Sequence, residues 1–130
     1  MKVVVCGSYG DLEGFRSVLE TFRKIYGSKN VFPTEEHLVE SSPCIEAHHQ
    51  NKGETEDSLE LRAKLMQRYF EHIDKAGLII VVNEKHGKEH YGTGTAIEIG
   101  YAYAKGKTIR FARTPKENAN IVSLLRIGLI

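Results

Sequence analysis

Glu98 is the residue of this chain whose setting best suits chemistry. It is the only acid in residues 91–107, YGTGTAIEIGYAYAKGK, where it follows a glycine-rich turn and lies among small and apolar residues. A weakly hydrated carboxylate beside a ligand is suited to nucleophilic catalysis. The segment 95–98, TAIE, also fits the S/T-x-x-E capping box, in which the acid only bonds back to the start of its helix. The residues alone leave both interpretations open.

The neighbours of Glu98 indicate poor access to water. Residues 97–104 give the predicted helix 95–105 almost no polar face, so we expect that helix to be buried or to lie in a subunit interface. Poor hydration raises the pKa of a carboxyl group, whereas a nearby helix N-terminus favours the anion and lowers it. We therefore expect an ionised but weakly hydrated carboxylate at this position.

Two glycine-rich turns are candidate binding loops. The first is Gly7, Ser8, Tyr9 and Gly10, and the second is Gly92, Thr93, Gly94 and Thr95. Each leads into a predicted helix, and free backbone N–H groups at helix starts suit a phosphate or another anion. Neither turn is specific by itself, and the first, GSYG, matches neither the P-loop nor the dinucleotide fingerprint. The alternative is that glycine only makes these turns compact.

The elements that must position these residues alternate along the chain. Apolar runs predict strands at residues 2–6, 30–33, 77–83 and 107–112. Helical spacing of apolar residues predicts helices at residues 12–26, 56–75, 95–105 and 116–127. Residues 34–55 show no clear period, which indicates a long segment that is either functional or mobile.

Alternating strands and helices predict an α/β fold. We expect residues 1–130 to form a single domain, a three-layer sandwich of flavodoxin-like or Rossmann-like type with a four- or five-stranded, mainly parallel sheet. A fifth strand would have only residues 128–130 available. Right-handed crossovers place the loops after the strands along one edge of the sheet, and a ligand is expected at that edge.

Composition limits the classes of partner. The net charge is +1, from 18 basic and 17 acidic residues, and no polybasic stripe indicates nucleic-acid binding. The apolar runs are too short to span a membrane. Cys6 and Cys44 are the only cysteines, which is not a disulfide framework, so we expect a reduced, cytoplasmic setting.

Two further expectations concern metals and assembly. His86 and His90 are four residues apart, but Gly87 and their loop setting argue against a metal site, and we predict none. The apolar helix 95–105 and the apolar end of the chain, residues 121–130, predict a homo-oligomer, a dimer or larger.

Three segments together resemble the nucleoside 2-deoxyribosyltransferase family, which includes deoxynucleoside 5′-monophosphate N-glycosidases. They are CGS after the first strand, AGLIIVVN in the middle strand, and GTAIEIGYAYAKGK. The resemblance runs from the N-terminus to about Phe111. It implies that Glu98 attacks C1′ of a deoxyribose, displaces the base and forms a glycosyl-enzyme intermediate, which a second base or water resolves. This is the two-step logic of retaining glycosidases.

The resemblance also implies the residues that bind substrate. The first turn, which surrounds sugar and phosphate, comprises Gly7, Ser8, Tyr9 and Gly10. The turn before the nucleophile contributes Thr93, Gly94 and Thr95, and the two further positions are Tyr69 and Asn83. Two departures stand out. Tyr69 occupies the place of a family aspartate, and Gly92 and Thr93 stand where transferases carry an acid.

These observations predict cleavage or transfer at the N-glycosidic bond of a (deoxy)nucleoside or nucleoside monophosphate. The predicted partner is that small molecule, and no metal or organic cofactor is required. The two missing carboxylates motivate an alternative, a non-catalytic nucleotide- or nucleotide-sugar-binding module on the same scaffold. A structural or signalling domain without a small ligand is a third possibility.

Overall fold

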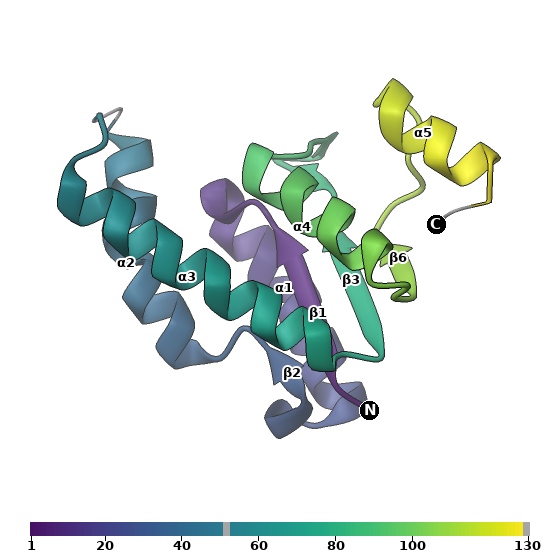
Figure 1. Ribbon diagram of the computed structural model, residues 1–130, viewed down its shortest axis with the longest axis horizontal. Coiled ribbons are helices and arrows are strands. Elements are labelled where there is room, and N and C mark those ends of the chain that lie inside the picture. The colour runs from purple at the N-terminus through teal and green to yellow at the C-terminus, as the bar shows by residue number, and fades with distance from the viewer. Residues whose placement is uncertain (51–52, 129–130) are drawn as a thin grey trace.

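The computed structural model describes residues 1–50 and 53–128, without the side chains of His48 and His49. Figure 1 shows the order of its helices and strands. In chain order they are β1 (Val3–Gly7), α1 (Leu12–Tyr26), β2 (Val31–Phe32), α2 (Glu35–His49), α3 (Glu56–Lys75), β3 (Leu78–Val82), β4 (Glu84–Lys85), β5 (Lys88–Glu89), α4 (Thr93–Ala104), β6 (Ile109–Phe111) and α5 (Ala119–Arg126).

The main sheet has four strands in the order β2-β1-β3-β6, and all its pairings are parallel. This confirms the predicted α/β sandwich of Rossmann-like or flavodoxin-like type. Residues 129–130, which a fifth strand would need, lie outside the described residues. The two central strands, VVVCG and LIIVV, are almost continuously apolar because helices cover both faces of the sheet.

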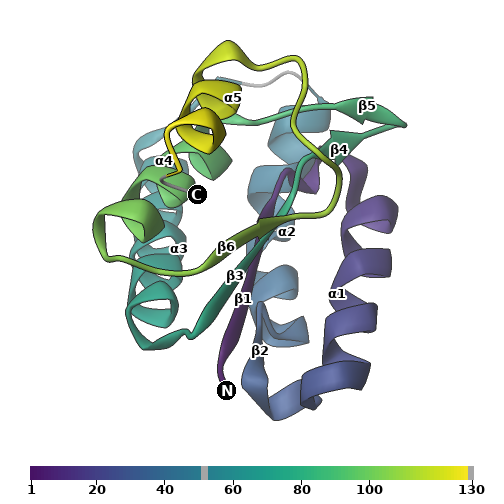
Figure 2. The same ribbon diagram turned by 90° about the vertical axis from the view of Figure 1, so that its right-hand side faces the viewer.

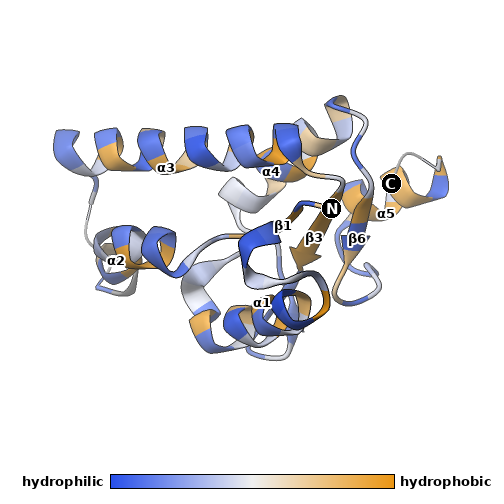
Figure 3. Ribbon diagram, turned by 90° about the horizontal axis from the view of Figure 1, so that it is seen from below, coloured by the Kyte–Doolittle hydropathy of each residue, from blue (hydrophilic) through white to orange (hydrophobic). Residues whose placement is uncertain are grey.

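Alternate residues of the strands form two separate cores. Val3 and Val5 of β1 pack with Phe15 and Leu19 of α1 on one face. Val4 and Cys6 pack on the other face, with side chains from α3 and α4. In Figure 2 the sheet lies between α1 and the α3–α4 pair, and Figure 3 shows the apolar strands β1 and β3 in the middle. Cys6 therefore points toward α4, the helix that carries Glu98.

Residues 34–55, in which the sequence shows no period, contain the helix α2. Thr34 caps it, since its Oγ1 accepts a hydrogen bond from the N–H of His37 at 3.2 Å. Among the side chains of α2 that the structure describes, the buried ones are Leu38 and the polar His37 and Ser41, and Pro43 lies inside the helix. A helix that buries polar side chains beside a single leucine shows no apolar stripe, which is why its period is hidden.

A hairpin, β4–β5, replaces part of the predicted loop after β3. Its turn residues His86 and Gly87 have φ of 51° and 79°, the pair of positive values that tight hairpin turns use. Glu89 accepts hydrogen bonds from three successive backbone N–H groups, those of residues 116–118, at 2.8–3.2 Å. The hairpin thereby holds the segment that leads into α5.

The helices differ from membrane-spanning ones in length or in polarity. Within residues 1–50 and 53–128, none combines the length and the apolar character that crossing a membrane requires. In the same residues, no three His, Cys, Asp or Glu side chains gather in a way that could hold a metal ion.

Candidate active site

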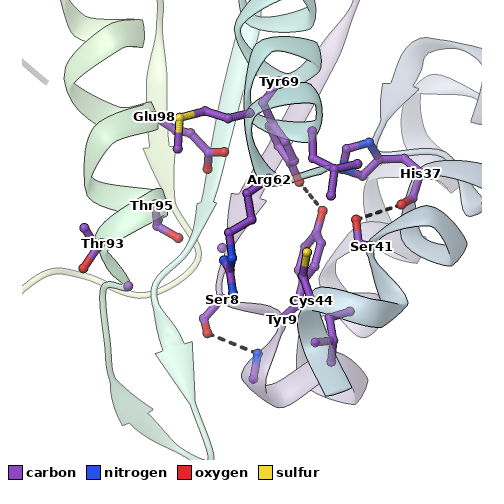
Figure 4. A pocket seen from close by; sticks show the side chains of 17 residues that line it. Ser8, Tyr9, His37, Ser41, Cys44, Arg62, Tyr69, Thr93, Thr95 and Glu98 are labelled. Atoms are coloured by element: carbon purple, nitrogen blue, oxygen red, sulfur yellow. Dashed lines mark hydrogen bonds between the residues drawn. The ribbon is translucent and has the colours of Figure 1, made fainter. Parts of the chain in front are cut away.

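A cavity of about 470 Å³ lies at the carboxyl end of β1, at the edge of the sheet where a ligand was expected. Its volume is in the range of small-molecule sites. Figure 4 shows the side chains around it. The lining comes from the turn after β1, from α2, from α3 and from the start of α4: Gly7, Ser8, Tyr9, Gly10, His37, Ser41, Cys44, Ile45, Arg62, Leu65, Met66, Tyr69, Gly92, Thr93, Gly94, Thr95 and Glu98.

Glu98 faces this cavity and does not cap its helix. Helix α4 begins at Thr93, its N-cap is Gly92, and no side chain caps it. Thr95 is thus inside the first turn and 4% exposed, so the capping-box interpretation is wrong. Thr95 and Glu98, three residues apart, share the helix face that lines the cavity.

The carboxyl group of Glu98 is held without a cation. Among the described residues it forms no ion pair, and the side chain that bonds it is the Cys6 thiol beneath it. Burial raises the pKa of Glu98 to about 8, and the Cys6 hydrogen bond lowers it only in part. The helix dipole adds little, because Glu98 lies in the second turn of α4 and the dipole acts mainly on the first.

The predicted buried helix is buried on one side only. Thr95, Ile99 and Ala102 of α4 are covered, whereas Ile97 is 44% exposed. The outer face of α4 is thus apolar and open to solvent.

Tyr9 and Tyr69 meet at the floor of the cavity. Their hydroxyl oxygens are 2.5 Å apart, and the Tyr69 hydroxyl donates to the carbonyl oxygen of Val5 at 3.1 Å. Since a hydroxyl has one proton, Tyr9 must be the donor to Tyr69, and both protons are then used within the protein. Burial raises the pKa of both phenols, so they stay neutral. The two hydroxyl groups can therefore only accept hydrogen bonds from a ligand.

The first glycine-rich turn is largely structural. A Cβ on Gly7 would lie 2.9 Å from Cβ of Val82 and 3.0 Å from its carbonyl oxygen, so the strands require glycine there. The N–H of Gly10 already donates to Ser8 Oγ at 3.2 Å. The compact-turn interpretation therefore accounts for Gly7, while Ser8 and Tyr9 present side chains to the cavity.

The second glycine-rich turn has the features of an anion site. Gly92 brings no capping side chain, and the N–H groups of Thr93, Gly94 and Thr95 have no hydrogen-bond partner among the described residues. Arg62 of α3 lines the same cavity, and in Figure 4 it extends toward the Ser8 turn. Its Nε lies 2.6 Å from Glu54 Oε1. Free N–H groups at a helix start and a guanidinium group together suit a phosphate.

Sequence reasoning missed the wall opposite α4. Helix α2 contributes His37, Ser41, Cys44 and Ile45 to the cavity. The Thr34 cap, followed by acids at 35 and 36, was the signal that a helix begins there. Arg62 of α3 also lines the cavity, and its position relative to α4 depends on how the two helices pack.

Asn83 lies apart from the cavity. It is fully buried, its Nδ2 donates to Tyr91 Oη at 3.0 Å and to the Arg113 carbonyl at 2.8 Å, and its Oδ1 accepts from the Arg113 N–H at 3.0 Å. These bonds tie the end of β3 to the segment after β6. The structure therefore places Asn83 in a structural network and not among the residues that line the cavity.

The chain was compared with protein-family models, with curated proteins and with solved structures. None of the three comparisons found a match. The resemblance to deoxyribosyltransferases stays a prediction from the motif residues.

The raised pKa of Glu98 predicts a measurable cost to stability. An acid whose folded-state pKa exceeds its unfolded value of 4.5 loses stability as pH rises between the two values, here from 4.5 to about 8. Glu98→Gln removes that loss. We expect the variant and the wild type to have the same free energy of unfolding near pH 4. At about pH 8.5 we expect the free energy of unfolding of the variant to exceed that of the wild type by more than about 1 kcal/mol. Urea unfolding at both pH values measures this, and an equal difference at both would contradict the burial of the charge.

Proposed function

We propose that this protein breaks the N-glycosidic bond of a nucleoside monophosphate or nucleoside, by hydrolysis or by transfer to a second base. The observation that carries the proposal is Glu98, a carboxyl group without a counter-charge that faces a cavity large enough for a nucleotide. A carboxylate in that setting is poorly solvated and is a stronger nucleophile than one in water.

The reaction follows from this position. A Glu98 oxygen forms a bond to C1′ of the sugar while the C1′–N bond breaks, and the bonding electron pair leaves with the base. Water or a second base then attacks C1′ and releases Glu98. Only the ionised form attacks, so base release rises with pH up to about 8, the pKa to which burial raises Glu98.

The start of α4 supports a phosphate on the substrate. Thr93, Gly94 and Thr95 offer free N–H groups one helical turn before Glu98, and Arg62 supplies the positive charge. A sugar 5′-phosphate held there leaves C1′ near Glu98. To bind it, Arg62 exchanges or shares its contact with Glu54.

One observation favours a second candidate, the non-catalytic nucleotide-binding module. Among the described residues Glu98 is the only acid that lines the cavity. By the family resemblance, Tyr69 stands where relatives carry a second carboxylate. With its pKa raised to about 8, Glu98 is largely neutral at physiological pH. Saturable nucleotide binding without base release at any pH would favour this candidate.

The first test is base release from a panel of nucleosides and nucleoside monophosphates. We expect Glu98→Gln to lower the rate by at least about a thousandfold, because it removes the nucleophile and keeps the shape. Chromatography of the free base between about pH 6 and pH 9 measures both this loss and the rise with pH. A variant that still cleaves at the wild-type rate refutes Glu98 as nucleophile.

A matched pair of glycines tests the phosphate position. A Cβ at Gly94 or at Gly100 would meet nothing within 4 Å, so alanine fits at either position of α4 and favours the helix. Only Gly94 lines the cavity. We expect Gly94→Ala to weaken nucleotide binding about tenfold or more by crowding the phosphate, and Gly100→Ala to leave it unchanged. Isothermal titration compares them, and equal affinities would place the phosphate elsewhere.

A further inference from the structure

The cavity has two facing walls. Glu98 enters from α4, and His37 and Ser41 enter from α2 on the far side of the Tyr9–Tyr69 pair, as Figure 4 shows. Displacement at a carbon atom places nucleophile and leaving group on opposite sides of that carbon. If Glu98 attacks C1′, the departing base therefore lies toward the α2 wall.

His37 is the group on that wall whose chemistry suits a departing base. It is 2% exposed, and its ring edge packs against Phe32 and Tyr69 with centroids 4.7 and 5.3 Å apart. The packing fixes the orientation of the ring. Ser41, in contrast, donates its hydroxyl proton to the carbonyl oxygen of His37 at 2.8 Å and has none left for a ligand.

The contact with Arg68 decides the tautomer of His37. Arg68 Nη1 lies 3.4 Å from His37 Nδ1, and a guanidinium group can only donate, so Nδ1 accepts and the ring proton is on Nε2. Arg68 is held in turn by Glu40, with Nη2 3.1 Å from Oε2. The Arg68 cation draws electron density from the ring and makes the Nε2–H a better donor.

Burial, more than the surrounding charges, keeps the His37 ring neutral. Burial lowers the pKa of His37 to about 4. The charges of Arg68 and His72 add to this decrease in the pKa, whereas the charge of Glu40 opposes it. The Nε2–H has no hydrogen-bond partner among the described residues. Every fully enclosed polar side-chain atom in those residues has a partner, so the Nε2 atom is not fully enclosed. Because His37 lines the cavity, we infer that this partly accessible Nε2–H faces it.

We propose that His37 is the leaving-group residue of this site, and that its Nε2–H donates a hydrogen bond to a ring nitrogen or carbonyl oxygen of the departing base. The proposal rests on the proposed function. As the C1′–N bond breaks, the electron pair passes to the base, and the hydrogen bond from His37 stabilises the negative charge that develops there. The base then takes a proton from water, and His37 stays neutral throughout. A donor of this kind selects bases that carry an acceptor at that position.

The test compares two leaving groups in the same variant. Guanosine monophosphate or its deoxy form loses its base as an anion, whereas the 7-methylguanine nucleotide loses a neutral base and needs no donor. His37→Asn removes the donor at Nε2, and His37→Gln retains an N–H close to it. The matched control is His72→Asn, because His72 also packs against Phe32, stacked with centroids 3.8 Å apart, but does not line this cavity.

We expect His37→Asn to lower kcat/KM about a hundredfold for the guanine nucleotide and less than about threefold for the 7-methylguanine nucleotide. His37→Gln recovers part of the loss, and His72→Asn matches the wild type on both. The ratio of the two rates within one variant does not depend on the folded fraction. An equal loss on both substrates, or no loss on either, overturns the role of His37 but not the proposed function. If the wild type releases neither base, the proposed function fails and this role with it.

Discussion

The site depends on one unfavourable interaction, the partial burial of the Glu98 carboxyl group at the cavity without a cation. Taking a charge out of water costs free energy unless it is paired, and here the one side chain that affects the pKa of Glu98 is the Cys6 thiol, through a hydrogen bond. The group responds with a pKa raised to about 8. A protein that retains such a residue in an open cavity gives up stability at that point, which is typical of catalytic groups. The rest of the fold keeps the group in place: β1 sets Cys6 beneath it, and α4 turns it toward the ligand.

The arrangement around Glu98 follows from helix positions. Helix α4 starts at Thr93, which leaves free N–H groups for an anion at its first turn and puts Glu98 one turn deeper. Helix α2 forms the opposite wall and brings to it His37, a neutral ring that we propose as a hydrogen-bond donor. Between them, the Tyr9–Tyr69 pair offers only acceptor oxygens. A sugar phosphate with a base at C1′ matches this order of anion site, nucleophile, acceptor floor and donor wall.

The central part of the fold could be predicted from the sequence because its signals are local. The apolar runs of β1 and β3 indicate buried parallel strands, and the alternation of elements indicates the sandwich. Helix α2 escaped detection because its buried face carries His37 and Ser41. The TAIE segment suggested a capping box with Thr95 as N-cap, but the N-cap of α4 is Gly92, three residues earlier. Asn83 was expected at the substrate and Arg62 was not, because tertiary packing decides whether a side chain meets the cavity or a neighbouring loop.

The most direct test of the account is the mass of the protein during turnover. The wild type, mixed with a nucleoside monophosphate that it cleaves and quenched in acid within a turnover, is analysed by intact mass spectrometry and peptide mapping. The account predicts an added sugar phosphate on the peptide that contains Glu98, and no such adduct in Glu98→Gln. Base release with the adduct on another residue, or base release from Glu98→Gln at the wild-type rate, would contradict it.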